Sequence, residues 1–333
     1  MELRALEREA EANRILLETF LSRLKEASTQ QDMNIQQPNA RILSQAITPI
    51  SATFPKKIPI LGMTLVVSAL FAILFVMIRE SRDHGLYTVG LVEEHTGLPS
   101  LGYIPTIGKM RARGKSPEAY LLEQPQSPFS SAIHTLYTNI FLLFPDIQPK
   151  SILVTSAQQK EGKTTIAYTL AMSRSLAGQK TIVIDADLKM TNANKAFDVK
   201  PSTGLVELLN GNVAIEEVIY TDEDTGIDIL PSGSLVQNSA ELLMSENMDT
   251  LMKILHETYD LIIFDSPAVL DAPDARILMR KVDATVFVAK WNQTKRQLIR
   301  ETLRHIAGAD NNIVGVVLNM VNERKQASYG YRF

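Results

Sequence analysis

One segment, residues 151–165 (SILVTSAQQKEGKTT), restricts the possible folds of this chain more than any other. The uninterrupted apolar run at 152–154 is typical of a buried strand, and residues 164–177 favour a helix. The loop between them ends in Gly-Lys-Thr-Thr. In a loop of this kind, backbone N–H groups and the positive N-terminal end of the helix surround phosphate groups. The segment therefore predicts a phosphate-binding loop between a strand and a helix.

Two side chains at the end of this loop suit the chemistry of a bound nucleotide. The amine of Lys163 is expected to reach the outer phosphates, and the hydroxyl of Thr164 is expected to ligate Mg²⁺. The match to the general phosphate-loop pattern is incomplete, because Ala157 stands where the pattern has glycine. For the loop taken alone, the alternative is a chance Gly-Lys-Thr sequence before a helix.

Two further apolar runs end in carboxylates. Residues 181–189 (TIVIDADLK) place Asp185 and Asp187 after a strand, and residues 261–267 (LIIFDSP) place Asp265 after another. Continuous apolar runs are typical of parallel strands buried on both faces, and doubly wound α/β folds bind ligands at the carboxyl ends of such strands. We expect Asp265 to orient Mg²⁺. In the alternative interpretation, these aspartates only cap the helices that follow.

The motifs TSAQQKEGKTT, VIDADLK and IIFDSPAVLDAPDA follow one another along the chain. In this order they resemble the Walker A, Walker A′ and Walker B motifs of the bacterial tyrosine kinases, a branch of the P-loop ATPases. The likeness covers roughly residues 120–333 and includes four shorter segments: 204–211, 230–233, 238–248 and 315–319. It implies an α/β fold with a doubly wound, mostly parallel sheet and helices on both faces.

Residues 58–78 form a stretch of 21 residues without a charge, which predicts one transmembrane helix. The stretch starts too far from Met1 for a cleaved signal peptide. Basic residues flank both of its ends, so local charge does not determine the orientation. Because nucleotide is cytosolic, we expect the C-terminal side to be cytoplasmic and residues 1–57 to be periplasmic, in a bacterial inner membrane.

The N-terminal segment carries a heptad-like pattern typical of an amphipathic helix. Its apolar seam has spacings of three and four: Leu3, Leu6, Ala10, Asn13, Leu17, Phe20 and Leu24. Pairing with another helix and a plain surface helix are both compatible with it. The order of this helix and the membrane span resembles the polysaccharide co-polymerases, in which the end of the periplasmic part is followed by a second membrane helix. The resemblance implies that a first span and a chain-length-determining domain are missing from this sequence.

Composition supports this organisation and excludes some functions. The chain has 333 residues, of which 45% are apolar, enough for one α/β domain and a membrane anchor. A net charge of −3 gives no support for nucleic-acid binding, and the absence of cysteine excludes disulfides and thiolate metal sites. We expect five regions: a periplasmic segment (1–57), the span (58–78), a cytoplasmic linker (79–128), a kinase domain (129–322) and a tyrosine-containing tail (323–333).

Within the expected linker, residues 89–105 resemble a short segment that packs on the kinase domain in the family. A basic cluster follows it: Lys109, Arg111, Arg113 and Lys115. Close to a bilayer such a cluster attracts anionic headgroups, which makes membrane lipid an expected partner. A solvated, flexible linker is the alternative.

The resemblance implies residue roles with ATP and Mg²⁺ as cofactors. The phosphates are expected to be held by seven consecutive residues: Gln159, Lys160, Glu161, Gly162, Lys163, Thr164 and Thr165. The expected magnesium ligands are Thr164, Asp185, Asp187 and Asp265. Lys163, Asp185 and Asp187 are the expected catalytic residues, with one aspartate accepting the tyrosine proton. Asn319 is expected to contact adenine, and Tyr329 or Tyr331 of a neighbouring subunit is the expected phosphoacceptor.

These roles predict an ATP-dependent tyrosine autokinase that regulates polymerisation and export of an exopolysaccharide. Expected partners are other copies of the chain, a polysaccharide polymerase, an outer-membrane export protein and a cognate tyrosine phosphatase. The alternative is a catalytically degenerate co-polymerase module that binds nucleotide or only scaffolds the export machinery.

Departures from the family pattern favour this alternative. Gln159 and Lys160 replace proline and glycine of the loop, and a side chain at 160 is unfavourable if the backbone there needs positive φ. The family's E-x-x-R-x-x-R assembly motif is also replaced, by Ser131, His134 and Tyr137. The tyrosine cluster of the tail is short.

Overall fold

The computed structural model describes residues 2–35, 55, 57–81, 85–108, 115–189, 203–306 and 312–328. The chain divides into two compact units, Met1–Val76 and Met77–Phe333, and each is described by itself. The basic positions 109, 111 and 113 and the tail tyrosines at 329 and 331 lie outside the described residues. The predictions made for them therefore stay predictions.

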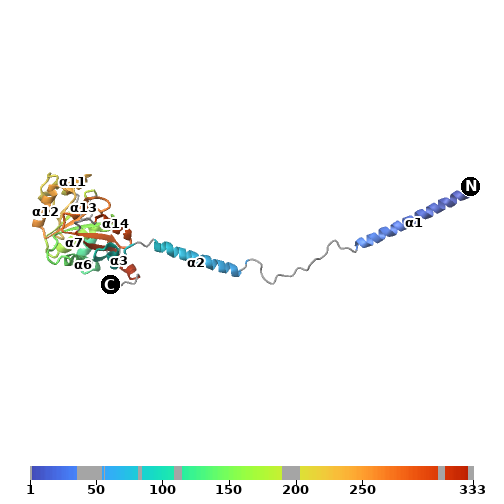
Figure 1. Ribbon diagram of the computed structural model, residues 1–333, viewed down its shortest axis with the longest axis horizontal. Coiled ribbons are helices and arrows are strands. Elements are labelled where there is room, and N and C mark those ends of the chain that lie inside the picture. Colours follow the sequence, from blue (N-terminus) through green and yellow to red (C-terminus); the bar gives the residue numbers. More distant parts are fainter. Residues whose placement is uncertain are drawn as a thin grey trace. The chain divides into compact units, whose positions relative to one another are not determined.

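The first unit contains two long helices, α1 (Glu2–Ile35) and α2 (Lys57–Ser81) (Figure 1). The last residues of α2 lie beyond Val76, where the first unit ends. α1 confirms the predicted N-terminal helix. Residues 57–77 of α2 have a mean hydropathy of 2.7 and are not buried in the protein, so this helix is long and apolar enough to cross a membrane. The hydroxyls of Thr64 and Ser68 donate to backbone carbonyls of their own helix, which is how hydroxyls are satisfied in an apolar surrounding.

The second unit is an α/β structure (Figure 1). Its strands are β1 (Ser100–Pro105), β2 (Ser151–Ser156), β3 (Thr181–Asp185), β4 (Tyr220–Thr221), β5 (Asp228–Leu230), β6 (Leu261–Asp265), β7 (Ala284–Lys290) and β8 (Ile313–Val321). Its helices are α3 (Val89–Thr96), α5 (Pro117–Glu123), α6 (Pro128–Leu142), α7 (Lys163–Ser175), α9 (Leu205–Leu209), α10 (Ile215–Val218), α11 (Ser239–Leu243), α12 (Glu246–Thr258), α13 (Asp274–Met279), α14 (Arg296–Ile306) and α15 (Glu323–Ser328).

The strands form one sheet in the order β1-β8-β7-β2-β6-β3-β5-β4. Every neighbouring pair is parallel except β4 with β5. β2, which leads into the predicted phosphate loop, lies between β6 and β7 near the middle of the sheet. This order confirms the predicted mostly parallel sheet.

Helices cover both faces of the sheet because its strands are apolar on both sides. In β2, Ile152 and Val154 belong to one buried cluster and Leu153 to the other. Helices α5, α6 and α7 cover the Ile152 face, and α3, α9, α12, α13 and α14 cover the Leu153 face. The continuous apolar runs of the sequence are therefore strands buried between two helical layers.

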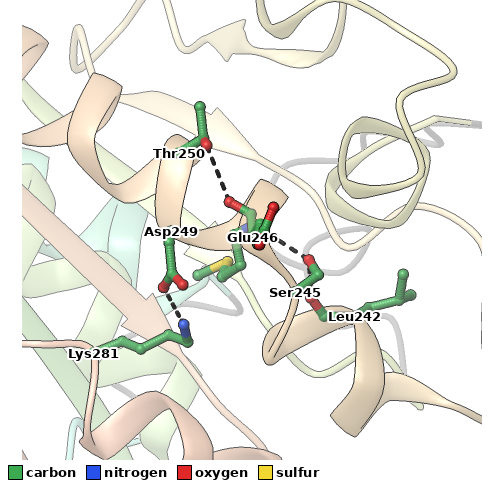
Figure 2. A network of polar contacts seen from close by, with 7 residues as sticks. Leu242, Ser245, Glu246, Asp249, Thr250 and Lys281 are labelled. Atoms are coloured by element: carbon green, nitrogen blue, oxygen red, sulfur yellow. Dashed lines mark hydrogen bonds and ion pairs between the residues drawn. The ribbon is translucent and has the colours of Figure 1, made fainter.

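Polar contacts fix the start of helix α12, the helix that precedes β6 in the chain (Figure 2). Ser245 is the N-cap: its hydroxyl accepts a hydrogen bond from the backbone N–H of Met248 at 3.3 Å. Lys281, which follows α13, forms an ion pair with Asp249 on the first turn of α12. The ion pair links the residues after α13 to α12, and both helices cover the same face of the sheet.

The sheet extends to residues before the expected domain boundary at 129. β1 pairs in parallel with β8 and forms one edge of the sheet, and α3 and α5 lie in its two helical layers. The expectation that residues 89–105 pack on the domain is confirmed. A Cβ at Gly315 would lie 2.5 Å from the Pro99 carbonyl oxygen, so glycine at this position of β8 permits the close approach of β1.

Candidate functional site

The loop between β2 and α7 has the geometry of a phosphate cradle. α7 begins at Lys163 directly after Gly162, whose φ of +95° an L side chain rarely adopts. Lys163 is 9% exposed, and among the described residues its ammonium group forms no ion pair. A nearly buried cation at a helix N-terminus favours an anionic ligand.

Asn319, at the end of β8, supports this loop directly. Its side-chain amide donates a hydrogen bond to the backbone carbonyl of Glu161 at 2.8 Å, and its side-chain oxygen accepts one from the N–H of Met320. The side chain is 5% exposed. In this structure Asn319 therefore braces the phosphate loop, while the adenine contact expected from the resemblance stays a prediction.

The carboxylates of β3 and β6 meet at the same edge of the sheet as the loop. Asp185 and Asp265 are paired across neighbouring parallel strands, and Val154 of β2 is the partner of Asp265 on its other side. Asp185 accepts hydrogen bonds from the N–H of Asp187 at 3.2 Å and from the Ser232 hydroxyl at 3.4 Å. The predicted convergence of these groups is confirmed for Asp185 and Asp265.

The carboxylate of Asp265 is buried at this edge of the sheet without a hydrogen-bond partner. It is 1% exposed, and neither of its carboxylate oxygens has a hydrogen-bond partner of normal geometry. Burial, and then the charge of Asp185, raise the pKa of Asp265 well above its usual range, against the lowering effects of the Thr164 hydroxyl and Lys163. An unpaired buried carboxylate is costly unless a cation satisfies it.

These groups fit Mg²⁺ with a nucleotide. Among the described residues, no three acidic, histidine or cysteine side chains cluster closely enough to hold a metal by themselves, so Asp185, Asp187 and Asp265 do not form a complete protein cage. Magnesium usually takes one or two carboxylates and completes its shell with phosphate oxygens and water. The unpaired carboxylate of Asp265 and the adjacent Thr164 hydroxyl supply that kind of partial set.

Two substituted positions of the loop differ in backbone geometry. Lys160 has a φ of +63°, in the region that glycine adopts without strain, whereas Ala157 is not among the described residues with positive φ. The side chain at 157 is instead buried in the core. A side chain in place of glycine therefore causes backbone strain at position 160 but not at position 157.

Replacing Lys160 with glycine should stabilise the protein, because glycine removes the cost of a side chain at positive φ, about 1 kcal/mol. Lys160→Ala removes the same charge but keeps a Cβ, so the difference between the two variants isolates the backbone effect. In denaturant unfolding, the free energy of unfolding of Lys160→Gly should exceed that of Lys160→Ala by about 1 kcal/mol. Equal stability of the two variants would contradict the assigned strain.

The positions of the lost assembly motif on α6 make contacts within the chain. The imidazole Nδ1 of His134 lies 2.9 Å from the Ser173 hydroxyl, in hydrogen-bond contact. The Arg174 guanidinium lies 3.8 Å from the ring centre of Tyr137. These side chains contact α7, and neither is the glutamate or arginine that forms the family's salt bridges.

Two residues near the site were not predicted. Tyr168, one turn after Thr164 on α7, is fully buried, and burial together with the charges of Asp185 and Asp265 raises its pKa well above the usual value. Its spacing of four from Thr164 places it on the same helix face, a signal that was present in the sequence. Ser232 lies in the 230–233 segment, whose resemblance to the family did not indicate a contact with Asp185.

The sheet, the loop and the carboxylates at neighbouring strand ends define the fold of a P-loop nucleoside triphosphatase. Over 210 residues the chain is 32% identical to the tyrosine-protein kinase YwqD of Bacillus subtilis strain 168, an alignment that covers 63% of this chain and 89% of that protein. The chain belongs to the family of bacterial tyrosine kinases.

Further comparisons cover both units. Residues 150–314 match the family "AAA domain", and residues 2–81 match "G-rich domain on putative tyrosine kinase". The succinoglycan biosynthesis transport protein ExoP of Rhizobium meliloti strain 1021 is 27% identical over 356 residues, which cover 99% of this chain and 45% of ExoP. The chain thus spans about half the length of several curated relatives it matches.

A solved structure gives the same assignment for the second unit. The kinase domain of the Escherichia coli tyrosine kinase ETK is similar with a TM-score of 0.68 and 27% identity. The similarity covers 75% of this chain and all of that domain.

Proposed function

We propose that this chain is an ATP-dependent protein-tyrosine autokinase of a bacterial inner membrane that regulates exopolysaccharide or capsule polymerisation and export. The observation that carries the proposal is the unpaired, buried carboxylate of Asp265 beside Thr164 and Lys163. The names of the relatives ExoP and YwqD support the pathway and the reaction class.

In the proposed mechanism the protein contributes positioning and charge neutralisation, which are the main requirements of phosphoryl transfer. Bound Mg²⁺ would offset the charge of the phosphates. Backbone N–H groups of the loop and the Lys163 ammonium hold the outer phosphates, and Thr164 and Asp265 hold the metal. Asp185 and Asp187 lie on the adjacent strand end, and one of them accepts the proton of the attacking tyrosine hydroxyl.

The proposed topology places the second unit in the cytoplasm, where ATP is available, with α2 as the span and α1 on the periplasmic side. The proposed partners are other copies of the chain, a polysaccharide polymerase, an outer-membrane export protein and a cognate tyrosine phosphatase. Because Ser131, His134 and Tyr137 replace the glutamate and arginines of the assembly motif, assembly of copies would not use the family's salt bridges.

The acceptor assignment can be tested on the full chain in detergent micelles with ATP and Mg²⁺. The double variant Tyr329→Phe/Tyr331→Phe removes both hydroxyl nucleophiles, so phosphotyrosine detected by antibody should fall at least about tenfold while ADP binding stays unchanged. A signal that survives the double substitution would move the acceptor elsewhere and leave the kinase activity standing.

The scaffold function is the second candidate, and the positive φ at Lys160 is the observation that favours it. A strained loop binds phosphate less well if its N–H groups are turned away from the ligand. Wild-type protein that binds ADP with Mg²⁺ but forms no phosphotyrosine would support the scaffold and reject the kinase.

A further inference from the structure

Glu161, the residue before Gly162 in the loop, has its carboxylate inside the protein. It is 3% exposed, and both oxygens are in use. One accepts a hydrogen bond from the backbone N–H of Gln158 at 2.9 Å, and the other accepts one from the hydroxyl of Thr294. The carboxylate therefore makes one hydrogen bond within the loop, to Gln158, and one to a distant segment of the chain, at Thr294.

Thr294 lies in the turn between β7 and α14 and is 1% exposed. Its hydroxyl accepts a hydrogen bond from the backbone N–H of Lys290 at 2.8 Å, so its single proton is directed to Glu161. The turn itself is anchored: the N–H of Trp291 donates to the backbone carbonyl of Asn319 at 2.9 Å, and the indole N–H of Trp291 donates to the carbonyl of Tyr87 at 3.1 Å.

We propose that Thr294 is a positioning residue for the phosphate loop. By donating to Glu161 it keeps this buried side chain turned into the protein, and it fixes the loop whose backbone N–H groups would hold the phosphates. Asn319 holds the backbone carbonyl of the same residue, so Glu161 is restrained at both its main chain and its side chain. This inference rests on the proposed nucleotide site.

The loss of the Thr294 hydroxyl should weaken nucleotide binding because a buried carboxylate would be left short of a donor. Thr294→Val keeps the shape and removes the donor, and Thr294→Ser keeps the donor. For the full chain in detergent micelles, we expect the Kd of ADP with Mg²⁺ to rise about tenfold in Thr294→Val, the equivalent of one lost hydrogen bond to a charged group. Thr294→Ser keeps the donor to Glu161, so its Kd should stay within about twofold of wild type.

A matched control is available on α14. Thr302 is also fully buried, and its hydroxyl donates to the backbone carbonyl of Leu298 at 2.8 Å without any link to the loop. Thr302→Val therefore deletes a buried hydroxyl of the same residue type in the neighbouring helix. It should leave the Kd of ADP unchanged.

Kinetics provide a readout that a general loss of stability would not give. Because the restraint acts on the loop before nucleotide is seated, Thr294→Val should raise KM for ATP and leave kcat at saturating ATP near the wild-type value. Where Thr294→Val does not accumulate as folded protein, Thr294→Cys, with its weaker S–H donor, should bind ADP less tightly than Thr294→Ser.

Two outcomes would overturn the proposal. The first is a Kd of ADP in Thr294→Val, or in Thr294→Cys if only that variant folds, equal to the wild-type value. The second is an equal loss in Thr294→Val and Thr302→Val, which would assign the effect to stability. Failure of wild-type protein to bind ADP would instead reject the nucleotide site itself, so the two failures are distinguishable.

Discussion

Lys163→Met should abolish tyrosine autophosphorylation and weaken binding of ADP with Mg²⁺ about 100-fold. Its ammonium is nearly buried at the start of α7, where a phosphate would be its counter-charge. Truncating one member of a buried charge pair costs about 3 kcal/mol, which corresponds to that change in Kd. Methionine keeps the apolar length of the side chain, so packing around α7 is retained.

The control for this variant is Lys180→Met. Lys180 lies directly before β3, whereas Asp185 is the last residue of that strand, so the control is at the other end of β3 from the site. Lys180 is exposed, and its ammonium lies 5.0 Å from the ring centre of Tyr259. The Lys180→Met variant should bind ADP with the affinity of the wild-type protein. Calorimetry measures the binding, and thermal unfolding without nucleotide checks that Lys163→Met is folded. Wild-type affinity in Lys163→Met would remove the phosphate role from this lysine.

Gly162→Ala should damage the site through a steric conflict. A Cβ at this position would lie 2.1 Å from the amide nitrogen of Asn319, which must then move away from the Glu161 carbonyl. The φ of +95° adds a backbone cost of about 1–2 kcal/mol. We expect lower stability and a Kd for ADP raised at least about tenfold, because the lost hydrogen bond loosens the loop that holds the phosphates.

Gly178→Ala separates the two causes. Gly178 also has positive φ, at +90°, but a Cβ there would have nothing within 4 Å. This variant should lose about 1–2 kcal/mol of stability from backbone strain and keep its affinity for ADP. Equal affinities in Gly162→Ala and Gly178→Ala would show that the contact with Asn319 does not shape the site.

The central strands could be predicted because their pattern is local. Uninterrupted apolar runs placed Asp185 and Asp265 at strand ends, and parallel strands necessarily bring those ends to one edge. β1 could not be placed in the sheet by the same means. It is six residues long, contains glycine and proline, and its partner β8 is far along the chain, so only tertiary pairing defines it as a strand.

Side-chain contacts between distant segments were the part of the site that could not be predicted. Thr294 lies 133 residues from Glu161, and nothing in its neighbourhood indicates a link to the loop. The role of Asn319 was inferred from resemblance, which does not determine where its amide points. For Lys160, the residue type indicated a possible conflict, but φ depends on how the folded loop is held.

The pairing of β1 with β8 has a practical consequence for where the second unit can be cut. A recombinant fragment started at the P-loop strand would lose β1 and leave the flank of β8 bare, with the apolar residues around Gly315 open to solvent and to strands of other molecules. A fragment with a protected sheet therefore has to keep β1 together with Gly85, which forms a bridge with Lys295.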